Sequence, residues 1–328
     1  MTDHVLGKGG ASPVVGTDQS ESRRGFFRQV AAGAVAAMGT HAASEGLHAA
    51  DTGADPAKLS TVKIGKHSVT RLVAGANPVS GYSHSSQTLS RHMREFFTLE
   101  RTIEFVQRIE KAGINTWQTN CSDKIHTTLR KVREQGSKIQ WVCLTADRAV
   151  EPSLDEIVAL KPIAIVHHGG VTDTMFRLNK HDKVHDFVKK VQDAGVMAGV
   201  SSHNPQNIAY VEEKGWENEL FMTCFYNVLR PGKDIRAKLG TIPLGEPFFE
   251  SDPAAMAEVV RQVKRPCLAF KILAAGRLAG TKHAVEGAFR FAYENIKKTD
   301  AVIVGMYPKF SDEIAHDAQL AQKYGMLA

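Results

Sequence analysis

Two short stretches of the chain carry side chains that can move protons. One is the run HHGG at 167–170, in which an imidazole can serve as a base near neutral pH and the glycines let the backbone approach a ligand. The other is Lys271, within the apolar run LAFKILAAG, where a lysine is rarely buried unless it is paired or functional. An ammonium there would bind an anion, stabilise an enolate or, once deprotonated, act as a base or Schiff-base amine. We therefore take His168, His167 and Lys271 as catalytic candidates.

Both stretches have a purely structural alternative. Adjacent residues of a strand point to opposite faces, so at most one of His167 and His168 would face a site while the other packs between strand and helix. Lys271 would in the same way reach outward between helices, with its apolar stem covering the surface.

Polar side chains also follow other apolar runs, and we take eight of them as substrate-binding candidates. These are Asn77, His84, Gln118, Asn120, Asp147, His203, Asn204 and Tyr226. Asn204 would equally cap a helix that starts at Pro205, and Tyr226 would equally pack in the core. A divalent metal site stays open, although no HxH or HExxH spacing supports one. Its ligands would be His84, His168, His203 and Asp147.

The elements that must position these residues alternate between short apolar runs and longer amphipathic stretches. We expect strands at 71–76, 115–119, 139–145, 162–167, 196–201, 220–226, 266–272 and 301–306. We expect helices at 99–111, 122–135, 153–159, 179–193, 205–213, 253–264 and 283–297. Apolar strands alternating with helices favour a parallel sheet covered on both faces. Eight such units predict a single α/β domain over 51–328, a closed (β/α)8 TIM barrel with its site at the carboxyl ends of the strands. A doubly wound open sheet is the alternative, but no GxGxxG follows the first strand.

Glycines between a helix and the next strand support the same barrel prediction. Gly113 and Gly195 each end a helix directly before a strand, where glycine supplies the left-handed residue that stops a helix. Two long segments, 80–97 and 230–252, are expected to be loops that overhang the site as lids or binding loops.

The first 50 residues differ in character from the rest. The run SRRGFFR at 22–28 has paired arginines and aromatics, and a short Ala, Gly and Val run with further small residues follows. This is the layout of a twin-arginine export signal with its processing region, which the twin-arginine translocase reads. The apolar run is well short of the roughly 20 residues that span a bilayer. We therefore expect a bacterial protein that is periplasmic or otherwise exported (secreted), with no stable membrane span.

The net charge limits the classes of molecule that this protein is expected to bind, and the cysteine spacing bears on the role of its thiols. The formal net charge is +6, without a basic run interleaved with aromatics, so we expect no nucleic-acid partner but a small polar molecule. The four cysteines form no CxxC, and three of them stand inside apolar runs, where a free thiol is usually a small core residue.

The order of several short motifs resembles the aldo/keto reductase superfamily. The run LVAG at 72–75 resembles that family's first strand, and GVSS at 199–202 resembles its G-V-S-N. The run FYN at 225–227 resembles its Y-N at strand six, and the small-residue turn at 273–280 resembles the turn after strand seven. The resemblance implies a (β/α)8 barrel that transfers hydride from NADP(H) to a carbonyl.

The chain is more similar still to a group of exported bacterial barrels without an assigned reaction. These carry G-N-P-x-S-G-x-S-H after strand one, H-G-G-x-x-D at strand four and F-K-x-L-A-A-G at strand seven. The corresponding runs here are 75–84, 168–173 and 270–276.

The residues that perform hydride chemistry in the reductase family are mostly replaced here. The family's Asp falls on Gln118, its Tyr near Asp123 and its Lys on Thr145 or Ala146, while a His survives at 167 or 168. Without the Tyr and Lys no obvious acid would protonate a carbonyl that receives hydride. We therefore expect no NADP(H), with a divalent metal left open.

These departures favour an enzyme that is a lyase, hydratase, isomerase or hydrolase rather than an oxidoreductase. The expected reaction is proton transfer next to a carbonyl of a small carbohydrate-like substrate, with His168 as acid or base and Lys271 facing the oxyanion. One alternative is an NADP(H)-dependent oxidoreductase of the aldo/keto reductase type. Another is a non-catalytic binding protein of the cell envelope.

Overall fold

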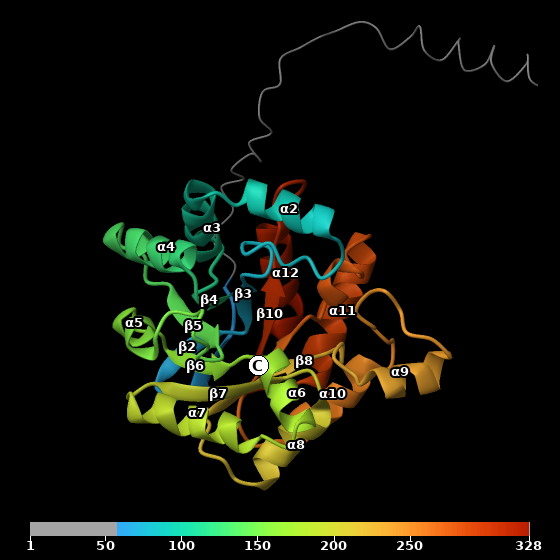
Figure 1. Cartoon of the computed structure of the whole chain (residues 1–328). Helices are drawn as coiled ribbons and strands as arrows, with labels where there is room; N and C mark the ends of the chain where they lie inside the picture. The colour runs from blue at the N-terminus through green and yellow to red at the C-terminus, as the bar shows by residue number, and fades with distance from the viewer. Residues whose placement is uncertain (1–57, 328) are drawn as a thin grey trace, which may run out of the picture. The chain divides into compact units, whose positions relative to one another are not determined.

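The computed structural model describes residues 58–327 (Figure 1). The export signal predicted for 1–50 lies outside the described residues.

Within this range, eight parallel strands close into a barrel in the order β10-β3-β4-β5-β6-β7-β8-β9. The strands are β3 (Leu72–Gly75), β4 (Thr116–Asn120), β5 (Gln140–Thr145), β6 (Ala164–His167), β7 (Met197–Ser202), β8 (Leu220–Cys224), β9 (Cys267–Phe270) and β10 (Ala301–Gly305). All neighbours pair in parallel, so every carboxyl end opens at the same mouth of the barrel. The predicted (β/α)8 barrel is confirmed, and each predicted strand overlaps an observed one.

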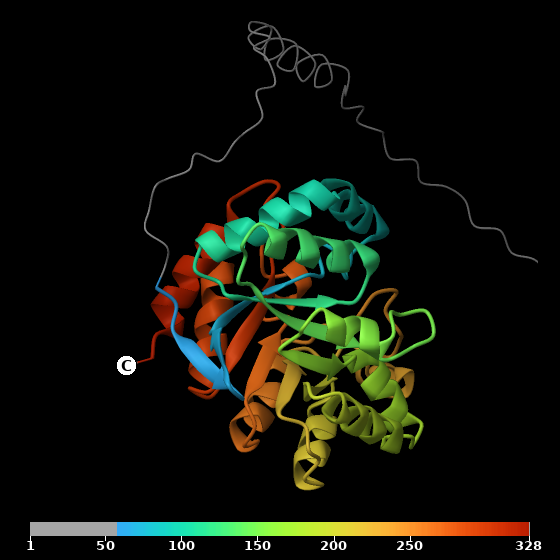
Figure 2. The ribbon, with the colours of Figure 1, turned by 90° about the vertical axis from the view of Figure 1, so that its left-hand side faces the viewer.

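Helices surround the barrel (Figures 1 and 2). They are α2 (Gln87–Phe96), α3 (Leu99–Lys111), α4 (Asp123–Glu134), α5 (Leu154–Ala159), α6 (Gly169–Arg177), α7 (Asp182–Asp193), α8 (Pro205–Glu213), α9 (Gly232–Leu239), α10 (Asp252–Gln262), α11 (Lys282–Asn295) and α12 (Glu313–Gly325), with the 3-10 turn η1 (Ala274–Gly276). Gly113 and Gly195 have φ of 87° and 75°, which confirms the predicted left-handed helix ends.

The expectation that 80–97 and 230–252 are loops without helices is wrong in part. The first contains α2, whose start is fixed because the Ser86 hydroxyl accepts the backbone N–H of Leu89 at 3.1 Å. The second contains α9, which ends at Gly240 with φ of 74°. Serine in the first segment, and glycine and proline in the second, favour the interpretation of both segments as loops.

Strand residues alternate between the barrel interior and the helix layer. Val73, Val166 and Leu268 pack in one cluster inside the barrel, whereas Leu72 and Ile165 pack in the larger cluster against the helices. This alternation decides which side of the sheet each strand-end side chain faces.

A hairpin that the sequence analysis does not predict closes the amino-terminal end of the barrel. Its strands are β1 (Thr61–Ile64) and β2 (His67–Thr70), paired antiparallel. Val62, Ile64 and Val69 belong to the same buried cluster as the interior strand residues. Figure 2 shows the hairpin in blue beside the last residues of the chain, and Leu327 donates its backbone N–H to Ser60 at 3.0 Å.

The four cysteines are buried and free. No helix among residues 58–327 has the length and apolar character required to cross a membrane.

Candidate functional site

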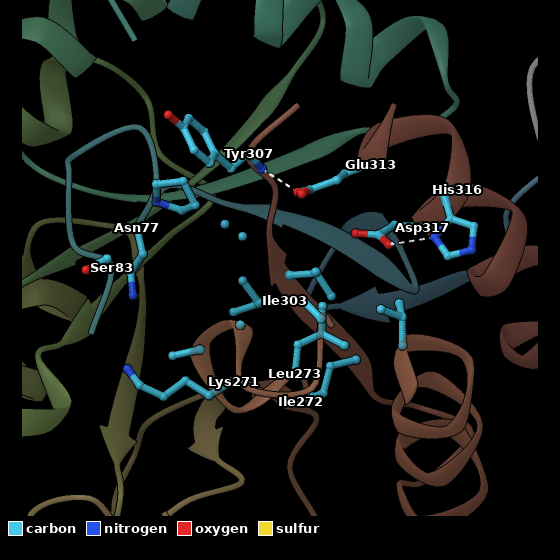
Figure 3. Close-up of a pocket in the computed structure, with 18 of the residues that line it drawn as sticks. Asn77, Ser83, Lys271, Ile272, Leu273, Ile303, Tyr307, Glu313, His316 and Asp317 are labelled. Carbon is cyan, nitrogen blue, oxygen red and sulfur yellow. Dashed lines mark hydrogen bonds and ion pairs between the residues drawn. The ribbon is translucent and has the colours of Figure 1, made fainter. Parts of the chain in front are cut away.

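A cavity of about 760 Å³ opens at the carboxyl ends of β3, β9 and β10 (Figure 3). This volume lies in the range of roughly 300–1,000 Å³ typical of small-molecule sites. Asn77, His84 and Lys271 form a polar end. Part of the apolar wall consists of Ile272, Leu273 and Ile303.

Four side chains meet at the polar end, and we call Asn77, His84, Glu246 and Lys271 the His84 cluster. The Glu246 carboxylate lies 2.8 Å from His84 Nδ1 and can only accept, so Nδ1 carries the proton and donates it. His84 Nε2 then offers its lone pair, and both Asn77 Nδ2 and Lys271 Nζ approach it to 3.1 Å. An ammonium, an amide donor and an imidazole lone pair thus converge on one point.

Left-handed backbone at two of these residues produces the convergence. His84 has φ of 53° and Lys271 has φ of 59°, values that are uncommon for residues with a Cβ. In β9 the interior side chains are Leu268 and Phe270, so an extended backbone would send Lys271 outward to the helices. The left-handed turn instead brings its amine to the cavity, where it also lies 5.5 Å from the centre of the Phe270 ring. Such strained residues concentrate at functional sites because the surrounding structure must hold them in place.

Glu246 is an ionised partner for His84. Burial raises the pKa of its carboxyl, but the hydrogen bond from His84 and the nearby positive charge of Lys271 outweigh that effect and leave the pKa below its ordinary value. Its second oxygen, Oε2, is buried and has no hydrogen-bond partner among the described residues.

The segment that carries Glu246 is anchored at both ends. Arg230 forms an ion pair with the buried carboxylate of Asp252, which joins the two ends of 230–252. In between, the Phe248 ring contacts Tyr226 at 5.1 Å and carries the Arg277 guanidinium 3.8 Å from its centre. These contacts hold the segment that places Glu246 against His84 Nδ1.

Arg277 also joins this segment to the one that carries His84. Its Nη2 donates to the backbone oxygen of His84 at 3.0 Å, while its guanidinium lies on Phe248. The two overhanging segments are therefore held together through one side chain.

His168 has a structural task at the start of α6. Its Nδ1 accepts the backbone N–H of Gly170 at 3.2 Å, so its proton sits on Nε2. Burial lowers the pKa of His168, and the positive charges of Arg148 and His203 lower it further. A neutral imidazole with one nitrogen committed to a helix end is a hydrogen-bond donor rather than a ready base.

His167 points the other way, as the alternation in β6 requires. Its ring packs against Phe187 of α7 with centroids 4.8 Å apart, and its Nδ1 lies 2.7 Å from the Thr172 hydroxyl. Burial lowers its pKa to about 4, with the charge of His168 contributing. The structure thus places His167 between strand and helix, away from the cavity.

A second group of polar residues, the Asp173 cluster, consists of Asp173, Ser202, His203 and Asn207. The buried Asp173 carboxylate accepts from His203 Nδ1 at 2.7 Å and from the His203 backbone N–H at 3.2 Å. Ser202 Oγ and Asn207 Nδ2 donate to it at 2.5 and 3.0 Å. One carboxylate therefore ties the end of β7 to α6 and α8.

The remaining sequence candidates separate into cavity residues and residues with other partners. Gln118 lines the cavity. Asn120 accepts the Ser80 hydroxyl at 2.9 Å, and Asn204 caps α8 by accepting the Gln206 N–H at 3.1 Å. Burial raises the pKa of Tyr226, which packs on Phe248.

Asp147 pairs with Lys190 of α7 at 2.5 Å, so it does not join His84, His168 and His203. Among residues 58–327 no three His, Cys, Asp or Glu side chains are placed to hold a metal ion, and the four suggested ligands do not form a set.

Two residues that organise these clusters escaped the sequence analysis as site candidates. Asp173 ends the H-G-G-x-x-D motif, and that position was a signal for it. Glu246 stands in a segment rich in glycine and proline, where no spacing singles it out.

Scans of the sequence against protein-family models and curated proteins give no match. Among solved structures, glycerol dehydrogenase AKR11B4 from Gluconobacter oxydans aligns with a TM-score of 0.50 and 11% identity, over 79% of this chain and 90% of that one. A truncated 3-deoxy-D-arabino-heptulosonate 7-phosphate synthase from Thermotoga maritima aligns with a TM-score of 0.47 and 12% identity, over 80% and 90%. Dihydropteroate synthase from Xanthomonas albilineans aligns with a TM-score of 0.47 and 11% identity, over 81% and 97%. At such identity the likeness shows the fold alone: this chain has a (β/α)8 barrel, the fold of a structural neighbour that is an aldo/keto reductase.

Proposed function

We propose that this chain is an exported enzyme that moves a proton on the carbon next to a carbonyl group of a small carbohydrate-like substrate. Its reaction class is elimination, hydration or isomerisation. The observation that carries the proposal is the meeting of Asn77 and Lys271 on His84 Nε2 beside the cavity.

In this proposal the substrate carbonyl oxygen replaces His84 Nε2 as the acceptor of these two donors. Lys271 brings a positive charge and Asn77 a directed N–H, so the pair stabilises the negative charge that develops on an enolate oxygen. Donors already pointing at one position need little reorganisation when the charge appears there.

Release of those donors frees the His84 lone pair to act as the base. The substrate C–H bond breaks, its electron pair moves through the carbon–carbon bond to the carbonyl oxygen, and the proton goes to His84 Nε2. Glu246 then faces an imidazolium across the same 2.8 Å contact and stabilises it. In an isomerisation the proton returns to the former carbonyl carbon, while the hydroxyl proton on the adjacent carbon passes to the former carbonyl oxygen. In an elimination the carbonyl re-forms as the β-hydroxyl group leaves, and the proton held by His84 makes that group water.

This assignment moves the base from His168, expected from sequence, to His84. His168 commits Nδ1 to the start of α6, whereas His84 has a carboxylate behind Nδ1 and a lone pair facing the cavity. Since no step moves a hydride, NADP(H) takes no part in the proposed reaction.

Solvent-deuterium exchange tests the proposal without knowledge of the product. The protein lacking its first 50 residues would be incubated in D2O with a panel of aldoses, ketoses and uronic acids, and the α-hydrogen followed by NMR. We expect exchange on at least one compound, and a loss of about 10²- to 10⁴-fold in His84→Ala. Lys271→Ala should lose about 10²- to 10³-fold.

His185→Ala is the matched control, because His185 is also an imidazole paired with a carboxylate, Glu217, at 2.6 Å on the outer surface. It should exchange at the wild-type rate. Absence of exchange across the panel, or full exchange in His84→Ala, would refute the proposal.

A further inference from the structure

The cavity continues beyond the His84 cluster to a second polar end. Past the apolar wall of Ile272, Leu273 and Ile303 it reaches the start of α12, where Glu313 and Asp317 line it (Figure 3). These two acids stand four residues apart, so they lie on the same face of the helix. We call Glu313 and Asp317 the acid pair.

Asp317 is buried without a hydrogen bond. Its side chain is 5% exposed, and its ion-pair contact with His316 Nδ1 is 3.9 Å long, beyond hydrogen-bond reach. Figure 3 shows one carboxylate oxygen toward His316 and the other toward the cavity. A buried polar group left without a partner is costly, so this oxygen is placed for a group that arrives from the cavity.

Glu313 is satisfied on one side only. Its Oε2 accepts the backbone N–H of Tyr307 at 2.5 Å, while no described residue hydrogen-bonds to its other oxygen. Burial raises the pKa of both acids, and the charge of Glu313 raises that of Asp317 further. A carboxyl group that keeps its proton can donate one hydrogen bond and accept another, which is the pattern of a hydroxyl group.

Three carboxyl groups gather at this end, because Asp312 lines it beside the acid pair. Lys282 and His316 also line the cavity, but its described lining contains no arginine, so no guanidinium offers a phosphate paired N–H donors. The adjoining apolar wall suits the C–H faces of a ligand chain or ring.

We propose that the acid pair binds hydroxyl groups of an uncharged sugar or polyol and excludes phosphate esters. This site goes beyond the proposed function, because it stands on the cavity and the acid pair and not on the chemistry of the His84 cluster.

Isothermal titration calorimetry with defined probes tests the site. The neutral probes are maltose and sorbitol, and the charged probes are maltose 1-phosphate, sorbitol 6-phosphate and glucosamine. We expect a neutral probe to bind wild type, with the affinity reduced about tenfold in Asp317→Asn and in Glu313→Gln, since each loses a hydrogen bond to a carboxyl group. The phosphate esters should bind more weakly than their neutral parents.

Matched variants separate this site from the proposed catalysis. Glu294→Gln removes one carboxylate from the exposed face of α11 and should bind as wild type does. Lys271→Ala should keep the affinity for the neutral probe even though it loses exchange. Thermal unfolding of each variant checks that it is folded.

The proposal is wrong if neither neutral probe binds wild type, if a phosphate ester binds as tightly as its parent, or if only glucosamine binds. It is equally wrong if folded Asp317→Asn and Glu313→Gln both keep full affinity.

Discussion

The molecule contains two imidazole–carboxylate pairs of nearly equal length and different surroundings. Glu246 and His84 are 2.8 Å apart on two segments that overhang the mouth, with side chains 32% and 24% exposed. Asp173 and His203 are 2.7 Å apart at the ends of regular elements, with side chains 6% and 10% exposed. The first pair presents the imidazole Nε2 at the cavity and leaves one buried carboxylate oxygen without a partner, whereas in the second the carboxylate is saturated with donors from the protein.

The difference shows that the contact itself does not assign a role. A saturated, buried carboxylate fixes three elements relative to one another, and it has no capacity left for a substrate. The partly exposed pair holds little of the fold together, but it orients an imidazole toward a cavity. We therefore assign the proposed chemistry to the pair of His84 and Glu246, which contributes less to the stability of the fold.

The largest expected effect is on stability. Asp173→Ala removes the acceptor of four donors, and two of them, the backbone N–H and Nδ1 of His203, have no other acceptor among the described residues. We therefore expect a loss of about 3–5 kcal/mol in the free energy of unfolding. Glu246→Ala should lose less than about 1 kcal/mol, as is usual for an exposed pair. Urea denaturation of the two variants measures both, and equal losses would erase the distinction.

The pH dependence of the unfolding free energy tests the effect of burial on a histidine that is held by the fold, His167. The folded pKa of His167 is about 4 and the unfolded value about 6.5, so between these pH values the unfolded chain binds a proton that the folded chain refuses. The free energy of unfolding should therefore fall as pH falls through this window, by up to about 3 kcal/mol from His167.

Comparison of wild type with His167→Gln isolates that contribution, because His126 and His168 also have lowered pKa values and remain in both proteins. The difference in unfolding free energy between the two proteins should shrink from pH 7 to pH 4. A constant difference would mean that His167 is protonated at the same pH in both states.

Glu246→Gln should act on rate rather than on stability. The amide keeps the shape but loses the charge that faces the imidazolium, so we expect deuterium exchange to slow about tenfold to a hundredfold, equal to about 1.4–2.7 kcal/mol of activation free energy. The unfolding midpoint should stay near that of wild type. Unchanged exchange would remove Glu246 from the proposed mechanism.

The smallest effect is expected at His203. Exchange per folded molecule in His203→Gln should remain within about fivefold of wild type, because its role lies in the Asp173 cluster. A loss as large as that of His84→Ala would assign the base to the buried pair instead.

The sequence predicts the scaffold better than the site. Strand positions follow from apolar runs, and the helix ends at Gly113 and Gly195 follow from glycine chemistry, since both signals are local. The helix α12 has a readable period in EIAHDAQLAQKYG but is missing from the predicted elements. The helix α6 is missed because its glycine-rich start reads as a ligand loop.

The arrangement of the site depends on facts that composition does not encode. The residues around Lys271 do not predict its left-handed backbone. Glycine is the usual residue in that conformation, and a lysine at the end of a strand is expected to be extended. Glu246 reaches His84 across 162 residues of chain, a contact set by the folded segment and not by spacing. The alternation rule, by contrast, allows only one of His167 and His168 to face the barrel mouth, and the structure places His167 in the helix layer.

The hairpin at the amino-terminal end of the barrel limits the routes by which a small molecule can reach the cavity. Val62, Ile64 and Val69 pack across that end and side chains fill the interior, so the described barrel has no channel from one end to the other. A molecule bound in the cavity therefore enters and leaves on the side of the barrel where the strands have their carboxyl ends. The overhanging segments that carry His84 and Glu246 would therefore govern departure as much as arrival, and a crosslink between them would trap a bound molecule as effectively as it would bar a new one.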